Sequence, residues 1–160
     1  MGGSASPQSG SYDEVESVVR ASRALMGIVA RSLADALESV TLPQFRALVV
    51  LASSGPQPIG VLAAKLGSVP STFSRFLDRM ENAGLVERQP SPGSRREILI
   101  ALRPKGAAIV QEATEQRRAA MRQVLQGVSK EDLAGIVAAF DTFSRAAGEP
   151  APETLLILGL

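Results

Sequence analysis

The sequence predicts a mainly α-helical fold in which long helices at both ends of the chain flank a middle segment of short helices and a β-hairpin. Apolar residues recur every three to four positions near both ends, which is the spacing of an amphipathic helix. In the middle, proline and glycine divide the chain into short helical segments and two strand-like runs. With 160 residues, 45% of them hydrophobic, the chain can form one compact domain.

The first expected element is a long helix over residues 12–40. It follows a Gly-, Ser- and Pro-rich segment, residues 1–11, that we expect to be disordered. The apolar side of the helix consists of Val15, Val18, Val19, Leu25, Met26, Val29, Leu33 and Leu37. A short second helix is expected next, because Thr41 and Gln44 have the spacing of a capping box, in which the two side chains satisfy free backbone amides.

Two more short helices, joined by a tight turn, are expected in the middle of the chain. Residues 54–58 interrupt the helical pattern, and the third helix that follows them ends at Gly67. Pro70 suits the first position of a fourth helix, where its missing amide hydrogen removes no hydrogen bond. The buried stripe of the fourth helix is Phe73, Phe76, Leu77 and Met80.

A β-hairpin with a basic tip is expected after Gly84, which ends the fourth helix. Strand-like runs cover residues 85–88 and 97–102. The segment between them contains two prolines and a glycine, and it ends with Arg95 and Arg96. We therefore expect a turn that presents two arginines.

Two further helices are expected over residues 104–148. Pro104 opens the first of them, and Ser129, followed by acidic residues, marks the capped start of the last one. The chain closes with an apolar tail, residues 149–160, which either caps an interface, covers a ligand cavity or is disordered. The apolar stripes at both ends of the chain exceed what one small core could cover, so we expect two chains to pair through them. The alternative is that these helices pack only within one chain.

The composition excludes several classes of function. The chain has no cysteine and no histidine, which rules out disulfides, Cys/His zinc sites and histidine acid–base catalysis. It has no glycine-rich nucleotide-binding loop and no metalloprotease motif, so we expect no enzyme activity and no cofactor. No apolar run approaches the roughly 20 residues that cross a bilayer, and no signal peptide is apparent. We therefore expect a cytoplasmic protein without membrane contacts.

The short helices and the hairpin together predict a surface for double-stranded DNA. Two helices joined by a tight turn can place the second one in the major groove, where hydroxyl and guanidinium groups bond to phosphates and base edges. The candidates on that helix are Ser71, Thr72, Ser74, Arg75 and Arg79. Arg95 and Arg96 can reach the adjacent minor groove, whose negative potential attracts arginine. The net charge is only +1, but residues 70–105 hold an excess of basic groups.

The middle of the chain resembles the DNA-binding domain of the MarR (multiple antibiotic resistance regulator) family in the order and spacing of its motifs. The matching segments are LPQFRAL at 42–48, LAAKLG at 62–67, PSTFSRFLDRME at 70–81, GLVER at 84–88, Arg95-Arg96 and PKG at 104–106. The resemblance covers about residues 41–106 and implies a winged helix-turn-helix DNA-binding lobe over residues 41–103. It also implies that residues 12–40 and 104–148 are dimerisation helices.

The resemblance implies a homodimeric transcriptional regulator, usually a repressor, that binds a pseudo-palindromic operator. Ser71, Thr72, Ser74 and Arg75 would then occupy the major groove, and Arg96 would lie on the wing. Family members commonly leave DNA when a small phenolic or lipophilic effector binds between the dimerisation helices and the DNA-binding lobe. Met26, Leu33 and Phe45 could line such a pocket, although their helical spacing favours the core.

Three residues depart from the family pattern. Ser94 stands where the wing usually has an Asp that orients the arginine two residues on, and Arg103 stands where a Thr usually follows the second wing strand. Val69 replaces a common helix-capping hydroxyl, so that Ser68 or a DNA phosphate must satisfy the first-turn amides. These departures concern the wing and the start of the fourth helix.

One alternative function uses the same surface. If the arginine-bearing face meets an acidic protein rather than DNA, the chain is a winged-helix protein–protein interaction module. The mixture of hydroxyl and guanidinium groups beside a basic wing suits a DNA groove better than a flat protein surface. Salt dependence separates the two functions, because DNA binding releases condensed counterions.

Overall fold

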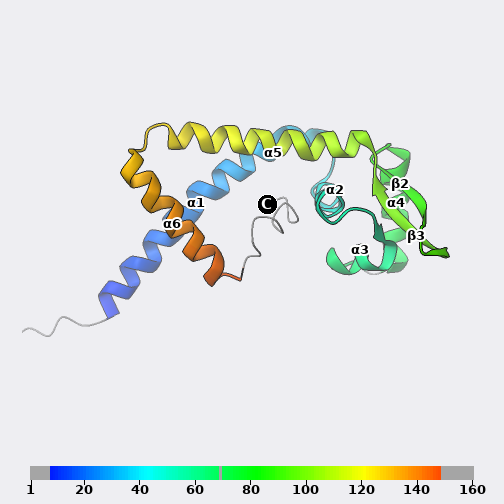
Figure 1. Cartoon of the computed structure of the whole chain (residues 1–160), viewed down its shortest axis with the longest axis horizontal. Coiled ribbons are helices and arrows are strands. Elements are labelled where there is room, and N and C mark those ends of the chain that lie inside the picture. The colour runs from blue at the N-terminus through cyan, green and yellow to red at the C-terminus, as the bar shows by residue number, and fades with distance from the viewer. Residues whose placement is uncertain (1–7, 69, 149–160) are drawn as a thin grey trace, which may run out of the picture.

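The computed structural model describes residues 8–68 and 70–148, which form six helices and a small antiparallel sheet (Figure 1). In chain order the elements are α1 Gln8–Ser39, α2 Leu42–Ser54, β1 Gln57–Pro58, α3 Ile59–Lys65, α4 Pro70–Asn82, β2 Val86–Ser91, β3 Ser94–Leu102, α5 Pro104–Leu125 and α6 Lys130–Ala146. The mainly α-helical, winged-helix fold predicted from the sequence is confirmed. Helix α1 begins at Gln8, so the expectation of disorder is wrong for residues 8–11. Val69 and the apolar tail, residues 149–160, lie outside the described residues.

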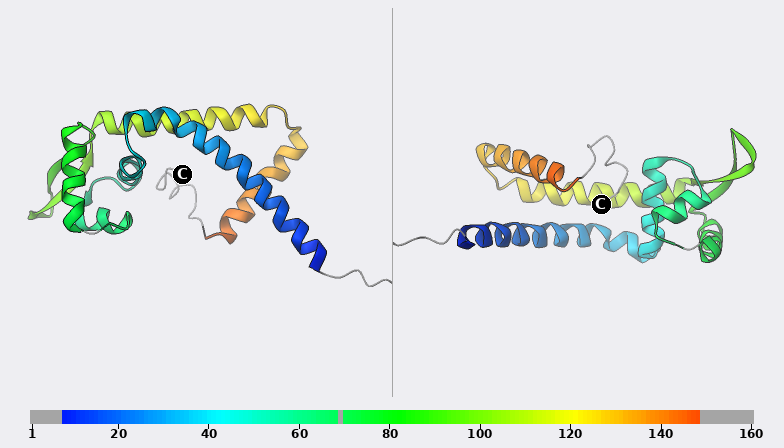
Figure 2. Two further views of the ribbon diagram at one scale, coloured as in Figure 1. Left: turned by 180° about the vertical axis from the view of Figure 1, so that it is seen from behind. Right: turned by 90° about the horizontal axis from the view of Figure 1, so that it is seen from below.

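The chain consists of one lobe and of long helices that extend from it. Helices α2, α3 and α4 and the sheet form a lobe at one end, and α1 and α5 extend side by side from it (Figures 1 and 2). Helix α6 turns back from the far end of α5. It crosses α1 in one view of Figure 2 but lies in a separate layer when seen from below.

The hydrophobic core lies in the lobe. Its fully buried large side chains are Leu48, Leu62, Leu77, Met80, Leu85, Ile100 and Val86. These residues come from α2, α3, α4, the sheet and the turn before β2, and α1 and α5 add Ala36 and Ala113. Full burial of one such side chain is worth about 1.5–3 kcal/mol, so this cluster holds the lobe together. Of the residues considered for an effector pocket, Phe45 belongs to the core cluster, Leu33 is partly buried and packs against it, and Met26 is 68% exposed.

Two helix starts agree with the capping signals in the sequence. The Gln44 side chain reaches back to accept a hydrogen bond of 2.9 Å from the Thr41 backbone amide, which fixes the start of α2. The Ser129 hydroxyl accepts a hydrogen bond of 3.0 Å from the Asp132 amide and caps α6. Both caps satisfy amides that have no partner within their helix.

The wing, which is the hairpin of β2 and β3, differs from the hairpin predicted from the sequence. The sheet order is β1-β3-β2, and the turn between β2 and β3 contains only Pro92 and Gly93. Arg95 and Arg96 therefore belong to strand β3 and not to a loop, which corrects the expected hairpin tip. Strand β1 was not expected, because residues 54–58 contain two prolines. Proline is tolerated at sheet edges, where one side of the strand needs no hydrogen bonds, and both β1 and β2 are edge strands.

Helix α5 starts directly against the end of α4. Gly106 is buried, and a Cβ atom on it would lie 2.4 Å from the Leu85 carbonyl oxygen and 2.9 Å from Leu48 Cδ2. The Lys105 ammonium donates a hydrogen bond of 2.9 Å to the Ala83 carbonyl oxygen, beyond the last residue of α4. These contacts fix α5 to the turn that follows α4. Among residues 8–68 and 70–148, no helix is long and apolar enough to span a membrane.

Candidate nucleic-acid interface

Helix α4 presents a polar, exposed side opposite the core. Its buried stripe contains Phe73, Leu77 and Met80, which are at most 2% exposed. An α-helix turns by about 100° per residue, so Arg75 and Asp78 lie on the opposite side, and both are exposed. We call this the outward side of α4. On this side, the Arg75 guanidinium would face the base pairs if α4 lay in a groove of DNA.

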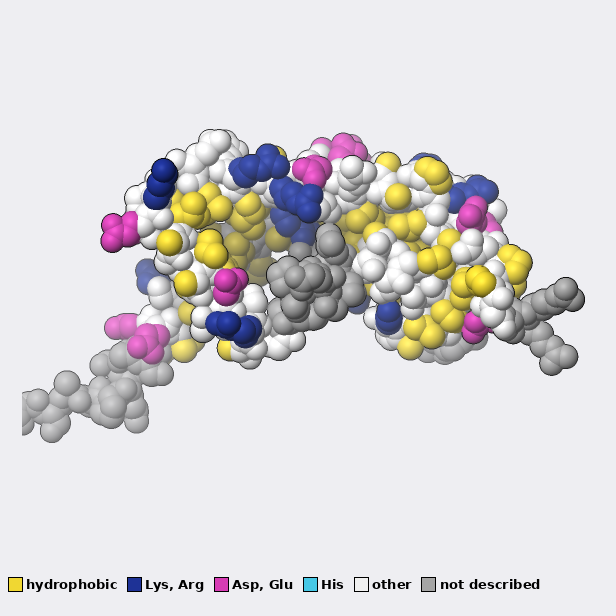
Figure 3. Space-filling view, viewed as in Figure 1, with side chains coloured by type: hydrophobic (Ala, Val, Ile, Leu, Met, Phe, Trp, Pro, Cys, Tyr) yellow, Lys and Arg dark blue, Asp and Glu magenta, His cyan; other side chains and the backbone are white. Residues whose placement is uncertain are grey.

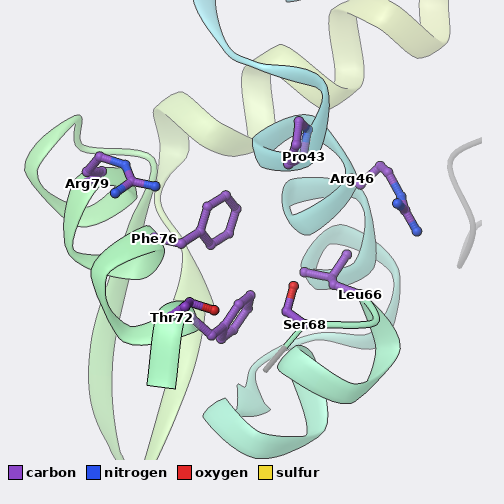
Figure 4. A pocket seen from close by; sticks show the side chains of 8 residues that line it. Pro43, Arg46, Leu66, Ser68, Thr72, Phe76 and Arg79 are labelled. Carbon is purple, nitrogen blue, oxygen red and sulfur yellow. The ribbon is translucent and has the colours of Figure 1, made fainter. Parts of the chain in front are cut away.

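The other candidate residues of α4 occupy its two flanks. Thr72 and Arg79 share one flank with Phe76, because they are spaced four and three residues apart, and this flank faces α2 (Figure 4). Ser74 lies seven residues before Glu81, on the flank that faces strand β2. The five residues predicted on this helix are therefore spread from one flank to the other across the side opposite the core.

Arg88 of β2 joins the wing to α4. Its guanidinium lies 2.7 Å from the Asp78 carboxylate and also forms an ion pair with Glu81. The Arg88 backbone amide donates a further hydrogen bond of 3.2 Å to Glu81. Burial by itself would lower the pKa of Arg88, but the hydrogen bonds and negative charges of Asp78 and Glu81 outweigh it and raise this pKa above its ordinary value. Arg88 stays charged and neutralises Asp78, the carboxylate on the outward side of α4.

Arg88 was not singled out from the sequence. The signal that could have identified it is the pair Asp78 and Glu81, which are three residues apart on one helix and are followed by a basic residue in the next strand. That signal is weak, because the ion pair depends on how the strand packs against the helix. The contacts of Arg88 with Asp78 and Glu81 connect α4 to the wing.

For the predicted wing residues and for Ser71, the structure defines the position of the backbone in the fold. Arg95 and Arg96 follow Ser94, which begins β3 and pairs with Ser91 across the wing. Ser71 lies in the first turn of α4. These positions put both groups of predicted DNA-binding residues in adjacent parts of one lobe.

Arg103 forms a bridge at the base of the wing. Although it occupies the N-cap position of α5, its side chain makes no capping hydrogen bond. Its guanidinium Nε instead lies 3.2 Å from the Glu87 carboxylate on β2. Both side chains are more than 40% exposed, so the pair contributes little to stability.

A recess of about 250 Å³ lies between α2 and α4 (Figure 4). Pro43 and Arg46 line it from α2, and Ser68 lines it from the turn that precedes α4. The rings of Phe73 and Phe76 are stacked at its floor, with their centroids 5.3 Å apart. Arg46 of α2 and Arg79 of α4 therefore both line a partly apolar hollow beside the candidate recognition helix, and the Arg46 guanidinium points outward from it.

Comparison with known proteins identifies relatives among transcriptional regulators. Residues 40–98 match the family model described as MarR family. The HTH-type transcriptional regulator YsmB of Bacillus subtilis is 35% identical over 96 residues, which span 60% of this chain and 66% of that protein. The chain thus spans just under two thirds of the length of this relative.

Solved structures match over most of the chain. The crystal structure of Rv1404 from Mycobacterium tuberculosis is 39% identical, with a TM-score of 0.71, and the match covers 86% of this chain and 94% of that one. The structure of a MarR family protein from Bacillus stearothermophilus is 27% identical, with a TM-score of 0.69, over 88% of this chain and 97% of that one. The similarity includes the long helices as well as the lobe.

Proposed function

The chain belongs to the MarR family of DNA-binding transcriptional regulators, and on this premise we propose that it is a homodimeric repressor of a pseudo-palindromic operator. Family membership confirms the prediction that the chain is a regulator and not an enzyme. The observation that carries the proposal is helix α4, which exposes Arg75 and is joined to the wing by the ion pairs of Arg88 with Asp78 and Glu81. We propose that the protein acts in the cytoplasm.

In this proposal helix α4 occupies the major groove. Arg75, on the outward side, donates two hydrogen bonds to a guanine, and the hydroxyls of Ser71, Thr72 and Ser74 bond to base edges or phosphates. Neutralisation of Asp78 by Arg88 supports this placement, because an unpaired carboxylate on the outward side would repel the phosphates.

The wing supplies the second contact in this proposal. Arg95 and Arg96 enter the minor groove beside the major groove that α4 occupies. A narrow A·T-rich minor groove attracts arginine through its negative potential and requires no base-specific hydrogen bond. The short Pro92–Gly93 turn supports this role, because it keeps the backbone of both arginines within strand β3.

Exposed apolar side chains on the terminal helices support the homodimer. No residue of α6 is buried, and Val137, Phe140 and Phe143 are 43–55% exposed. An apolar groove of about 300 Å³ runs between α6 and α1, with Val18 and Leu25 on the α1 side. Figure 3 shows hydrophobic side chains gathered over this half of the molecule. A second copy that inserts its own terminal helix would cover these surfaces.

The dimer explains why the operator should be an inverted repeat. A two-fold axis through the terminal helices relates two copies of α4, and the two copies reach successive major grooves when they lie about 34–36 Å apart. Release by a small phenolic or lipophilic effector completes the proposal: an effector that favours a different spacing of the two lobes lowers operator affinity.

Selection of binding sites from randomised duplex DNA at near-physiological salt tests this function. We expect an enriched inverted repeat with half-sites one helical turn apart, bound by a species of two chains. If no sequence is enriched and an acidic protein binds the same face instead, the chain is a protein–protein interaction module. A steep linear fall of log affinity with log salt concentration would identify DNA as the partner.

A further inference from the structure

We propose that the recess between α2 and α4 binds the sugar-phosphate backbone of the operator, with Arg46 and Arg79 as the two cationic contacts. This inference rests on the proposed function. It assigns a DNA-contact role to α2, which the sequence motifs did not suggest. It also moves Arg79 from the group of base-reading residues to the group that binds phosphate.

The charge of the recess favours a phosphate. Arg46 and Arg79 are both exposed, and no acidic residue lines the recess. The ion pairs seen among the described side chains join Arg88, Arg103, Arg118 and Arg122 to carboxylates. The guanidinium groups of Arg46 and Arg79 therefore make no ion pair with another described residue and are available to an anion.

The position of the recess on the flank of α4 favours contact with the sugar-phosphate backbone of DNA rather than with the bases. A helix in the major groove, which is about 12 Å wide, has base edges in front of it and a sugar-phosphate chain on each side. The outward side of α4, with Arg75, meets the bases. The flank with Thr72, Phe76 and Arg79 meets one of the two chains, and α2 lies on that flank.

The remaining groups of the recess suit a phosphate diester. Ser68 and Thr72 lie at the edge nearest the start of α4, and the Ser68 hydroxyl can donate to a phosphate oxygen there (Figure 4). The stacked Phe73 and Phe76 close the floor and exclude water from one side of the bound anion, which strengthens its attraction to the two cations. Arg46 lines the recess from α2 and Arg79 lines it from α4. In Figure 4 the Arg79 guanidinium points toward Phe76 and that of Arg46 points outward from α2, so a strand that crosses the rim on the α2 side meets Arg46 and then Arg79.

The test compares salt dependence in single variants of the full-length protein. In Arg46→Ala and Arg79→Ala we expect the slope of log affinity against log salt to become shallower by about 0.9 for each phosphate that the variant no longer binds, or about 1.8 per dimer. Operator and random duplexes should be weakened by the same factor, because an interaction with phosphate carries no sequence information. Arg46→Lys keeps the charge and should retain the wild-type slope.

Arg23→Ala is the matched control, because Arg23 is exposed on α1, outside the lobe, and its removal should leave the slope unchanged. Sizing of each variant verifies that the dimer is intact. If Arg46→Ala and Arg79→Ala keep the wild-type slope while Arg75→Ala relaxes base preference, the protein reads DNA through α4 and the recess assignment is wrong. Failure of the wild-type protein to bind any duplex would refute the proposed function itself.

A small anion is the other occupant that the test must distinguish. Benzoate, an aromatic carboxylate, serves as the probe and is titrated by calorimetry into wild-type protein and Arg46→Ala without DNA. We expect no saturable binding to either protein at millimolar concentrations. Saturable binding to the wild type that is abolished in Arg46→Ala, together with unchanged salt slopes, would make the recess a small-anion site and overturn the phosphate assignment.

Discussion

The guanidinium of Arg88 on strand β2 lies 2.7 Å from the carboxylate of Asp78 on helix α4. A second ion pair, with Glu81, and a backbone hydrogen bond to the same Glu81 carboxylate make this a three-point connection between the wing and the helix. The two elements that we propose to contact DNA are therefore held in one relative orientation. In the proposed complex, this preorganisation would lower the cost of engaging the major and minor grooves at the same time.

Replacing Arg88 should weaken the lobe more than replacing an arginine in an exposed ion pair. Arg88→Gln removes the partner of the half-buried Glu81 carboxylate, and we expect a loss of about 1–2 kcal/mol in the free energy of unfolding. Arg118→Gln, which breaks only the exposed pair with Glu115, should cost less than about 0.5 kcal/mol. Urea denaturation measures both values. Equal losses in the two variants would contradict the connecting role of Arg88.

Gly106 should tolerate no side chain. In Gly106→Ala the new methyl group would lie 2.4 Å from the Leu85 carbonyl oxygen, so α5 must shift away from the end of α4. We expect a loss of more than about 2 kcal/mol in thermal or urea unfolding. Gly60→Ala in α3 is the control, since its methyl group would meet nothing within 4 Å, and it should leave stability unchanged or raise it by up to about 1 kcal/mol.

Arg75 and Arg96 should affect DNA recognition differently. Arg75→Ala removes a base contact in the major groove and should relax base preference at one position of each half-site, at a cost of about 1–3 kcal/mol. Arg96→Ala removes a minor-groove contact and should weaken binding mainly to operators with A·T-rich flanks. Site selection with each variant measures both effects. Unchanged affinity and selectivity in both variants would contradict the assigned roles.

The exposed face of α6 should be required for dimer formation. Phe140→Asp places a charge in the proposed interface and should shift the protein to single chains in sedimentation velocity experiments. Val61→Asp in α3 is a matched control, because Val61 is 42% exposed and Phe140 is 43% exposed. The control should sediment like the wild type. A Phe140→Asp protein that remains fully dimeric would show that α6 lies outside the interface.

Most helices could be predicted because their signals are local. Helical spacing of apolar residues and the caps at Thr41 and Ser129 identified α1, α2, α5 and α6, and Pro70 marked the start of α4 correctly. These signals depend on residues within one or two turns of each other. They need no knowledge of what packs against the helix.

The features that were missed depend on contacts between distant segments. Strand β1 exists because Gln57 pairs with Ile100, and the prolines around it indicate only a break in the helix. The extended wing depends on the pairing of Ser91 with Ser94 and of Pro90 with Ile98, with a register shift between the two pairs, and Arg95 lies in strand β3 at that shift. The recess likewise joins Arg46 of α2 to Arg79 of α4, so no local pattern could indicate it.

Hydroxyl-radical footprinting of the wild-type protein on its selected operator, combined with the protein-to-DNA ratio from sedimentation, tests most directly whether a dimer reads an inverted repeat. We expect two chains per duplex and two protected regions on one face of the DNA, about one helical turn apart, with protection of the adjoining minor grooves by the wings. A single protected region, one chain per duplex, or protection without any preferred sequence would contradict the proposed function.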